Sequence, residues 1–198
     1  MNRSVAFFVG ILILIFLGFL LILTGGNGKK TPTNTPEVVA LPDYANTDAT
    51  VSFTTNGIVN GVDIHRAIRI TVGQDQRELD ILQGYSGQVL SSQTFANTTD
   101  AYSAFLKAIN NAGFLTKVKK PLVPASPDGQ CPMGYTYVLQ LNRGGNTLSN
   151  TWGSTCGTKV GNSAALITTT QQLFQNQITN YFTVIGSVNL SATTSSTQ

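Results

Sequence analysis

The order of apolar and polar positions divides the 198-residue chain into an apolar run, a polar stretch and a patterned C-terminal region. The run from Val5 to Leu23 contains no charged, amide, hydroxyl or proline residue. As a helix, and with the next three residues added, it covers about 30 Å, the thickness of a bilayer's hydrocarbon core. We therefore predict a transmembrane signal-anchor in residues 1–26, a Thr/Pro-rich spacer in 27–50, a folded domain in 51–190 and a disordered tail in 191–198.

Alternating apolar and polar residues predict antiparallel hairpins in the folded region. Ile64 to Val72 and Arg77 to Leu82 alternate on either side of the turn Gly73-Gln74-Asp75-Gln76. A register that puts the apolar residues of both strands on one face also puts Arg69 opposite Asp80 on the other. We predict that these two residues form a cross-strand pair at the surface.

A second hairpin is predicted around the turn Asn142-Arg143-Gly144-Gly145-Asn146. Its first strand, Tyr135 to Leu141, places Tyr135, Tyr137, Leu139 and Leu141 on one side. Its second strand, Thr147 to Ser154, places Leu148, Asn150 and Trp152 on one side. Further extended segments are predicted at Val51 to Val59, Gln88 to Gln93 and Phe114 to Lys120, and Val38 to Leu41 is an alternative start of the fold as an edge strand.

Two segments have helical spacing. The first begins with a predicted cap at Asn97, and Gly113 is suited to end it. Between them, apolar residues follow at intervals of three and four: Tyr102, Phe105, Leu106, Ile109 and Ala112. A second helix is predicted to start at Asn162 or Ser163 and to continue to Tyr181 or Phe182. The order of elements predicts an α+β fold, an antiparallel sheet of hairpins with two helices packed on one face.

The orientation of the predicted anchor is not decided by its flanking charges, because Arg3 and the terminal amine precede it and Lys29 and Lys30 follow it. Few charged residues, a Thr/Pro spacer and paired cysteines favour export, so we predict a cell-membrane protein with its C-terminal domain outside the cytoplasm. A cytoplasmic domain and a signal peptide cleaved after Gly26 are the alternatives. Gly26 stands where a lipobox would need a cysteine, which excludes lipid attachment there.

Cys131 and Cys156 are the only cysteines in the chain. They lie almost symmetrically before and after the second hairpin turn, so we predict a disulfide across the open end of that hairpin. A redox pair is the alternative, but these cysteines lack the C-x-x-C spacing of redox motifs.

The sequence contains no recognisable catalytic set. His65 is the only histidine, and we interpret it as a strand-surface residue. Asp75, Glu78 and Asp80 are interpreted as a solvated turn. One histidine and two separated cysteines cannot form a four-ligand zinc site, and no glycine-rich stretch has phosphate-loop spacing, so we predict no metal, no cofactor and no enzymatic activity. An envelope enzyme remains the alternative if His65 lies in a concave pocket near a carboxylate.

Two groups of residues are candidates for binding. The aromatic residues Tyr85, Tyr135, Tyr137 and Trp152 form a possible binding face, with core packing as the alternative. The cluster of Lys117, Lys119 and Lys120 is a possible contact with anionic lipids or wall polymers, with a solvated face as the alternative. Because this positive charge is local and forms no stripe, we predict no nucleic-acid binding.

Several short motifs occur in a particular order: Gly84-Tyr85-Ser86-Gly87-Gln88-Val89, Ala101-Tyr102-Ser103-Ala104-Phe105-Leu106, Asn111-Ala112-Gly113-Phe114, Cys131-Pro132-Met133-Gly134 and Trp152-Gly153-Ser154-Thr155-Cys156. This order resembles uncharacterised single-pass membrane-anchored proteins of small-genome, candidate-phyla bacteria. The resemblance covers Ile68 to Tyr181 and implies a membrane-anchored protein without implying an activity.

Together these patterns predict a non-enzymatic, single-pass surface protein that contacts the lipid bilayer through Val5 to Leu23. Its outer domain is expected to bind another envelope protein, a wall polymer or a host surface. A pilin-like or secretion-machine subunit is a further alternative. Type IV pilins also begin with a long apolar helix, but this chain has no acidic residue before Glu37, and Gly25-Gly26 with the spacer interrupts the helix.

Overall fold

The computed structural model describes residues 39–119, 121, 123–157, 160–186 and 188–191. The predicted anchor, Val5 to Leu23, and residues 192–198 of the tail lie outside the described residues. Within the described part of the chain, no helix is both long enough and apolar enough to span a bilayer.

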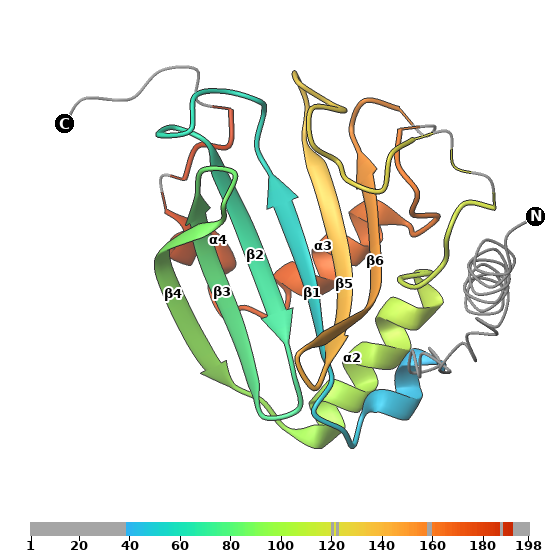
Figure 1. The fold of residues 1–198 in the computed structure, drawn as a ribbon. Helices are drawn as coiled ribbons and strands as arrows, with labels where there is room; N and C mark the ends of the chain where they lie inside the picture. The colour runs from blue at the N-terminus through green and yellow to red at the C-terminus, as the bar shows by residue number, and fades with distance from the viewer. Residues whose placement is uncertain (1–38, 120, 122, 158–159, 187, 192–198) are drawn as a thin grey trace, which may run out of the picture. The chain divides into compact units, whose positions relative to one another are not determined.

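A six-stranded antiparallel sheet forms the centre of the fold, with the strand order β4-β3-β2-β1-β5-β6 (Figure 1). The strands are β1 Thr50–Asn56, β2 Arg66–Val72, β3 Gln76–Gln83, β4 Gln88–Ala96, β5 Thr136–Arg143 and β6 Asn146–Ser154. Every strand pairs with a neighbour in sequence, and the pairing of β1 with β5 joins strands β1 to β4 to the hairpin of β5 and β6. The sheet of hairpins expected from the alternating patterns is confirmed.

The register between β2 and β3 is the one that the apolar pattern predicts. Val72 pairs with Arg77, and Arg69 pairs with Asp80. The Arg69 Nη2 atom donates to the Asp80 Oδ2 atom at 2.7 Å. The expectation of a simple surface pair is wrong for the acid, since the Asp80 side chain is 4% exposed while that of Arg69 is 37% exposed.

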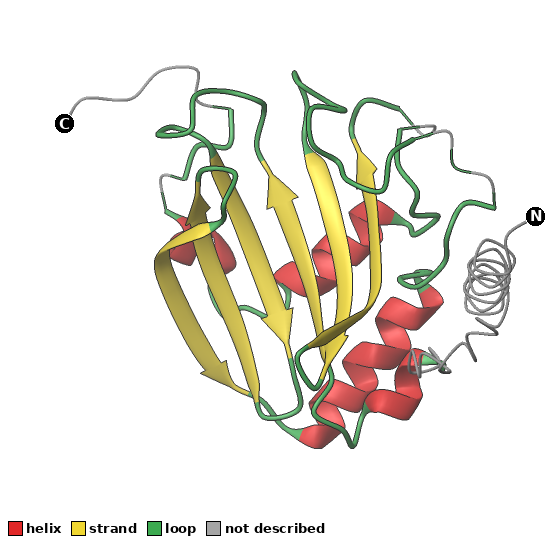
Figure 2. Cartoon of the chain, viewed as in Figure 1, coloured by secondary structure: helices red, strands yellow, loops and turns green. Residues whose placement is uncertain are grey.

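The helices of the described residues lie on one face of the sheet (Figure 2). They are the 3-10 helix η1 Leu41–Tyr44 and the α-helices α2 Thr99–Asn111, α3 Ile167–Gln175 and α4 Tyr181–Ile185. An α+β fold with helices against one side of an antiparallel sheet is thus confirmed, and η1 is a short helix that the sequence did not predict.

The helix α2 buries the predicted apolar stripe. Its N-cap is Thr98, whose hydroxyl accepts from the Ala101 amide at 3.3 Å. The predicted cap, Asn97, instead donates its side-chain amide to the Gly73 carbonyl at 2.7 Å. At the other end Gly113 has a φ of 79°, which favours glycine, as expected for a helix end.

Phe174 of α3 occupies the middle of the core. Its ring centroid lies 5.0 Å from that of Phe105 on α2, 5.5 Å from that of Phe53 on β1 and 5.8 Å from that of Phe114. Because these rings come from two helices, one strand and the segment after α2, this cluster joins the helical layer to the sheet.

The second predicted helix consists of two short helices. Asn180 has a φ of 56° between α3 and α4, and this left-handed residue ends the helical path. The predicted start is also shifted, because the Asn162 side chain accepts from the Trp152 amide at 2.7 Å and does not cap a helix. The apolar stripe nevertheless survives the break, since Phe174, Ile178 and Tyr181 are all buried.

Two segments differ from their predicted form. Leu41 and Tyr44, which the sequence assigns to the spacer, are buried in the core, so the folded region includes the last part of that stretch. The same segment is the 3-10 helix η1, so it does not form an edge strand. The predicted strand Phe114 to Lys120 is reduced, in its described part, to one isolated bridge between Lys117 and Ser163.

Candidate functional site

One face of the sheet lies opposite the described helices (Figure 2), and the registers place mostly hydroxyl and amide side chains on it. Residues directly opposite each other in a register point to the same face. The paired registers align six polar residues from β4 to β6 across its middle, five with a hydroxyl or amide group and one with a carboxylate: Thr94, Glu78, Thr71, Ser52, Gln140 and Asn150. An antiparallel sheet with one solvated face commonly has this polar composition. We call this surface the uncovered face.

A cavity of about 90 Å³ lies at one end of the uncovered face. Its floor is a row of sheet residues aligned by the register: Leu82, Ala67, Asn56 and Thr136. Its walls come from three connections, residues 57–65 after β1, 84–87 after β3 and 127–131 before β5. The Asn56 side-chain amide donates to the Thr136 hydroxyl at 3.1 Å across this floor.

Tyr85 stands in the wall of the cavity with 55% of its surface exposed. One side of its ring is stacked on the His65 imidazole, with centroids 4.2 Å apart. Its hydroxyl donates to the Asn60 carbonyl at 2.7 Å and accepts from the Asn60 amide at 3.0 Å. The side chain is therefore held by its stacked ring face and by its hydroxyl, and the rest of the ring is exposed.

His65 is buried under Tyr85 and is 4% exposed, so the expectation of a strand-surface histidine is wrong. Its Nδ1 atom lies 3.2 Å from the Ile58 carbonyl oxygen. A carbonyl can only accept, so we assign the hydrogen to Nδ1, which leaves the lone pair of the neutral ring on Nε2. Burial lowers the pKa of His65, and the nearby Arg66 lowers it further, against the raising effect of the hydrogen bond to Ile58. The neutral ring is favoured near pH 7.

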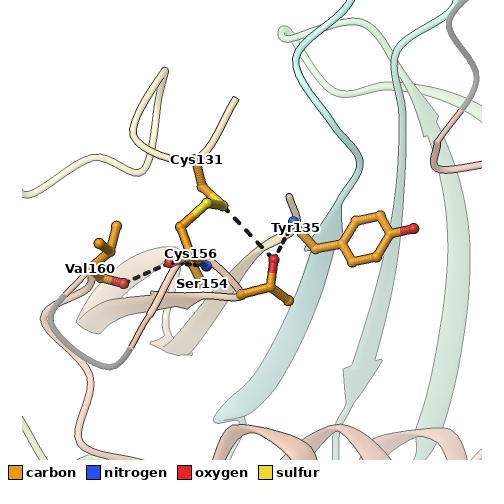
Figure 3. The surroundings of a disulfide bond; sticks show 6 residues. Cys131, Tyr135, Ser154, Cys156 and Val160 are labelled. Carbon is orange, nitrogen blue, oxygen red and sulfur yellow. Dashed lines mark hydrogen bonds between the residues drawn. A yellow bond between two sulfur atoms is a disulfide. The ribbon is translucent and has the colours of Figure 1, made fainter. Parts of the chain in front are cut away.

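The disulfide between Cys131 and Cys156 fixes the third wall of the cavity, and its prediction is confirmed. The two Cα atoms are 5.7 Å apart, a usual separation for a bridge. Figure 3 shows that the bridge closes the open end of the hairpin, next to the contact in which the Tyr135 amide donates to the Thr155 hydroxyl at 2.9 Å. The end of β6 thereby holds the loop that carries Asp128.

Gly134 makes this close approach possible. A Cβ atom at Gly134 would lie 2.3 Å from the Thr155 hydroxyl and 2.7 Å from the Cys131 sulfur. Real Cβ atoms do not come so close to such neighbours, so a side chain here would displace either the bridge or the end of β6. The glycine in Cys131-Pro132-Met133-Gly134 is thus required by the packing around the disulfide.

The other aromatic candidates do not join Tyr85 in one surface. Tyr137 points into the core, where its ring centroid lies 5.7 Å from that of Phe53. Trp152 points to the opposite side of the sheet but is only 1% exposed, since its Nε1–H donates to the Pro124 carbonyl at 3.0 Å. The Tyr135 hydroxyl makes a hydrogen bond with Ser191.

A bulge explains why Trp152 and Leu148 are on different faces. Leu141 pairs with Ser149 and the next residue pairs with Thr147, so Leu148 is an extra residue in β6. The bulge shifts the alternation by one residue, because an extra residue reverses the facing of everything beyond it. Leu148 packs against the core as a result, and Trp152 lies on the uncovered face beneath the loop before β5.

The lysine candidates lie outside the cavity. Lys117 and Lys119 are exposed, and neither lines the cavity. Lys120 lies outside the described residues. The described structure therefore adds nothing that would bring these lysines into one site with Tyr85.

The chemical groups in the cavity suit binding better than catalysis. Asp128 lines it together with His65, but the Asp128 Oδ2 atom accepts from the Ser126 hydroxyl at 2.6 Å within its own turn. No set of three or more histidine, cysteine, aspartate and glutamate residues in the described part of the chain is placed to hold a metal ion. Sequence reasoning missed Asn60 and Asp128, and the signal that could have found the site is the tyrosine between two glycines in Gly84-Tyr85-Ser86-Gly87.

No protein-family model matches this chain, and no curated protein matches it. A functional proposal therefore depends on the geometry of the cavity, the uncovered face and the residues that hold Tyr85.

Proposed function

We propose that this protein is a single-pass envelope protein whose folded domain stands outside the cytoplasm and binds a partner through the cavity and the uncovered face. The bilayer contact in this proposal is the apolar run Val5 to Leu23. The observation that carries the proposal is Tyr85, a half-exposed ring held by one stacking contact and two hydrogen bonds. An aromatic side chain that is already ordered loses little conformational entropy when a ligand covers it.

Two further observations support a binding role outside the cell. A disulfide that closes the hairpin suits an oxidising compartment and argues against the cytoplasm. The open cavity lies next to a polar sheet face that no helix of the described residues covers (Figure 1), so a partner larger than the cavity has room beside it. The resemblance to membrane-anchored proteins of candidate-phyla bacteria agrees with this location.

An envelope enzyme is the second candidate, and one observation favours it: His65 and Asp128 line the same cavity. With the hydrogen on Nδ1, the His65 Nε2 atom would be the base. The binding role is preferred because the imidazole is mostly covered by Tyr85 and because Asp128 is engaged by Ser126. The pilin-like alternative depends on a helix through Gly25 and Gly26, which lie outside the described residues.

The test is crosslinking from the native envelope with four full-length proteins: wild type, Tyr85→Ala, His65→Gln and Phe182→Ala. Phe182 is the matched control, because it is an aromatic residue with 77% exposure on α4, on the helical side of the sheet. We expect a crosslinked partner with wild type and Phe182→Ala and its loss with Tyr85→Ala. Equal crosslinking by wild type and Tyr85→Ala would contradict the proposed site.

A further inference from the structure

We propose that the cavity and Tyr85 bind one sugar residue of an uncharged polysaccharide, whose neighbouring sugars lie along the uncovered face. The inference rests on the proposed binding function and names the class of its ligand. It is carried by the size of the cavity, the presentation of Tyr85, and the charge and hydrogen-bonding groups around them.

The size of the cavity requires a ligand that extends beyond it. Its volume is about 90 Å³. Sites that enclose a free small molecule usually measure about 300–1,000 Å³. The cavity can therefore hold only part of a larger molecule, and the adjacent uncovered face is where the remainder can lie.

Tyr85 offers a flat apolar surface in a fixed position. One side of the ring is stacked on His65, and both hydrogen bonds of the hydroxyl go to Asn60, so the exposed part is chiefly ring. A pyranose has a flat side of C–H groups with partial positive charge, and an aromatic face carries partial negative charge. Stacking of a sugar on Tyr85 uses both surfaces without breaking a contact that the protein already makes.

Polar groups at the cavity suit hydroxyl groups that both donate and accept. The Asn56 Nδ2 atom is bound to Thr136, which leaves its Oδ1 atom as an acceptor on the floor. Asp128 adds a carboxylate in the wall opposite the sheet. Along the uncovered face the partly exposed Thr71 and Gln140 add a hydroxyl and an amide, whereas Ser52 between them is only 3% exposed.

The charges on this side disfavour a charged polymer. Among the described strand residues that point to the uncovered face, the charged ones are Arg69, Asp80 and Glu78. Arg69 is already paired with Asp80, and Asp128 stands at the cavity. The remaining charge is acidic, which would repel a polyanion, while the many neutral hydroxyl and amide groups match a neutral glycan. An extended peptide is the other occupant that the experiment must separate.

The experiment uses the full-length protein in detergent micelles, with binding to soluble tetrasaccharides measured by calorimetry. The neutral probes are the β-1,4-linked tetramers of N-acetylglucosamine and of glucose, and the α-1,4-linked tetramer of glucose. Tetragalacturonic acid is the anionic control, and a library of unstructured decapeptides tests peptide binding. We expect one neutral tetramer to bind at least tenfold more tightly than its monosaccharide and than tetragalacturonic acid.

Variants locate the binding. Tyr85→Ala should weaken the affinity for that tetramer by at least tenfold, and Asp128→Asn should weaken it by threefold or more. Phe182→Ala should change this affinity by less than twofold. Thermal melting of each variant must match wild type within a few degrees, and Tyr85→Phe serves as a second variant that keeps the ring if Tyr85→Ala does not fold.

Preference for tetragalacturonic acid or for a decapeptide, or no binding of any neutral tetramer, would overturn the inference. If native-envelope crosslinking still finds a partner that depends on Tyr85, the proposed binding function stands while the glycan is excluded. If neither the tetramers nor the crosslinked partner depend on Tyr85, both proposals fail.

Discussion

Tyr85 lies almost flat on His65, with ring centroids 4.2 Å apart and planes inclined by 18°. The exposed tyrosine thus serves two purposes, because the same ring that faces the cavity also covers the one histidine of the chain. Protonation of His65 would place a charge beneath this ring, beside Arg66, in a position where burial already lowers the pKa of the imidazole.

Acidification should therefore destabilise the domain. The folded pKa of His65 lies below the ordinary 6.5, so the unfolded chain binds more protons at pH values just under 6.5. The free energy of unfolding should fall as the pH decreases from about 7 through that range. Urea unfolding at several pH values measures this slope. His65→Gln, whose amide can still donate to the Ile58 carbonyl, should show a smaller slope, and an equal slope would contradict the assignment.

Reduction of the disulfide should cost a large part of the stability. Cys131 and Cys156 are 25 residues apart, for which the loop-entropy relation gives about 3.5 kcal/mol. Denaturant unfolding of wild type with and without reductant, and of the double variant Cys131→Ala/Cys156→Ala, measures this value. The double variant, which contains no cysteine, should match reduced wild type and should not respond to reductant. If the methyl group of Gly134→Ala destabilises the protein by pressing on the Cys131 sulfur, this variant should lower the free energy of unfolding only while the disulfide is intact.

Arg69→Ala and Asp80→Ala should lower the free energy of unfolding by different amounts. Arg69→Ala leaves a nearly buried carboxylate without its cation, and should cost about 2 kcal/mol, whereas Asp80→Ala leaves a half-exposed guanidinium that water can solvate. The double variant should recover part of the loss of Arg69→Ala. Urea unfolding of the complete double-mutant cycle measures this, and equal costs for the two single variants would contradict the burial argument.

Phe174→Ala should be among the most destabilising substitutions in the core. Its ring contacts aromatic residues from α2, from β1 and from the segment after α2, and such truncations cost about 3–5 kcal/mol. Phe182→Ala, on the exposed side of α4, should change the free energy of unfolding by less than about 0.5 kcal/mol. Calorimetric or urea unfolding of both variants makes the comparison directly.

The local patterns predicted the sheet well, because both its pairing and its burial follow from alternation. The register of Arg69 with Asp80 could be predicted from the spacing within the hairpin of β2 and β3. The disulfide between Cys131 and Cys156 could be predicted in the same way from the hairpin of β5 and β6. Leu148 was wrongly grouped with Asn150 and Trp152 on one side of β6, since the alternation within a single strand does not reveal the extra residue at Leu148.

The cavity could not be predicted from local sequence patterns. His65 is buried by Tyr85, which comes from a different connection, and the third wall of the cavity comes from the loop before β5. These contacts are set by how three loops meet at one end of the sheet. The motif Gly84-Tyr85-Ser86-Gly87 marked a turn with an aromatic residue, but only the fold shows what that residue covers.

Limited proteolysis of intact cells should test the outward orientation and the start of the folded region together. Lys29 and Lys30 lie in the predicted spacer, so external trypsin should release a fragment that begins at Lys30 or Thr31. External chymotrypsin should not cut after Tyr44, since that side chain is 2% exposed in the core. Mass spectrometry of the released fragments identifies their first residues. Full protection in intact cells, with cleavage after permeabilisation, would mean that the domain faces the cytoplasm.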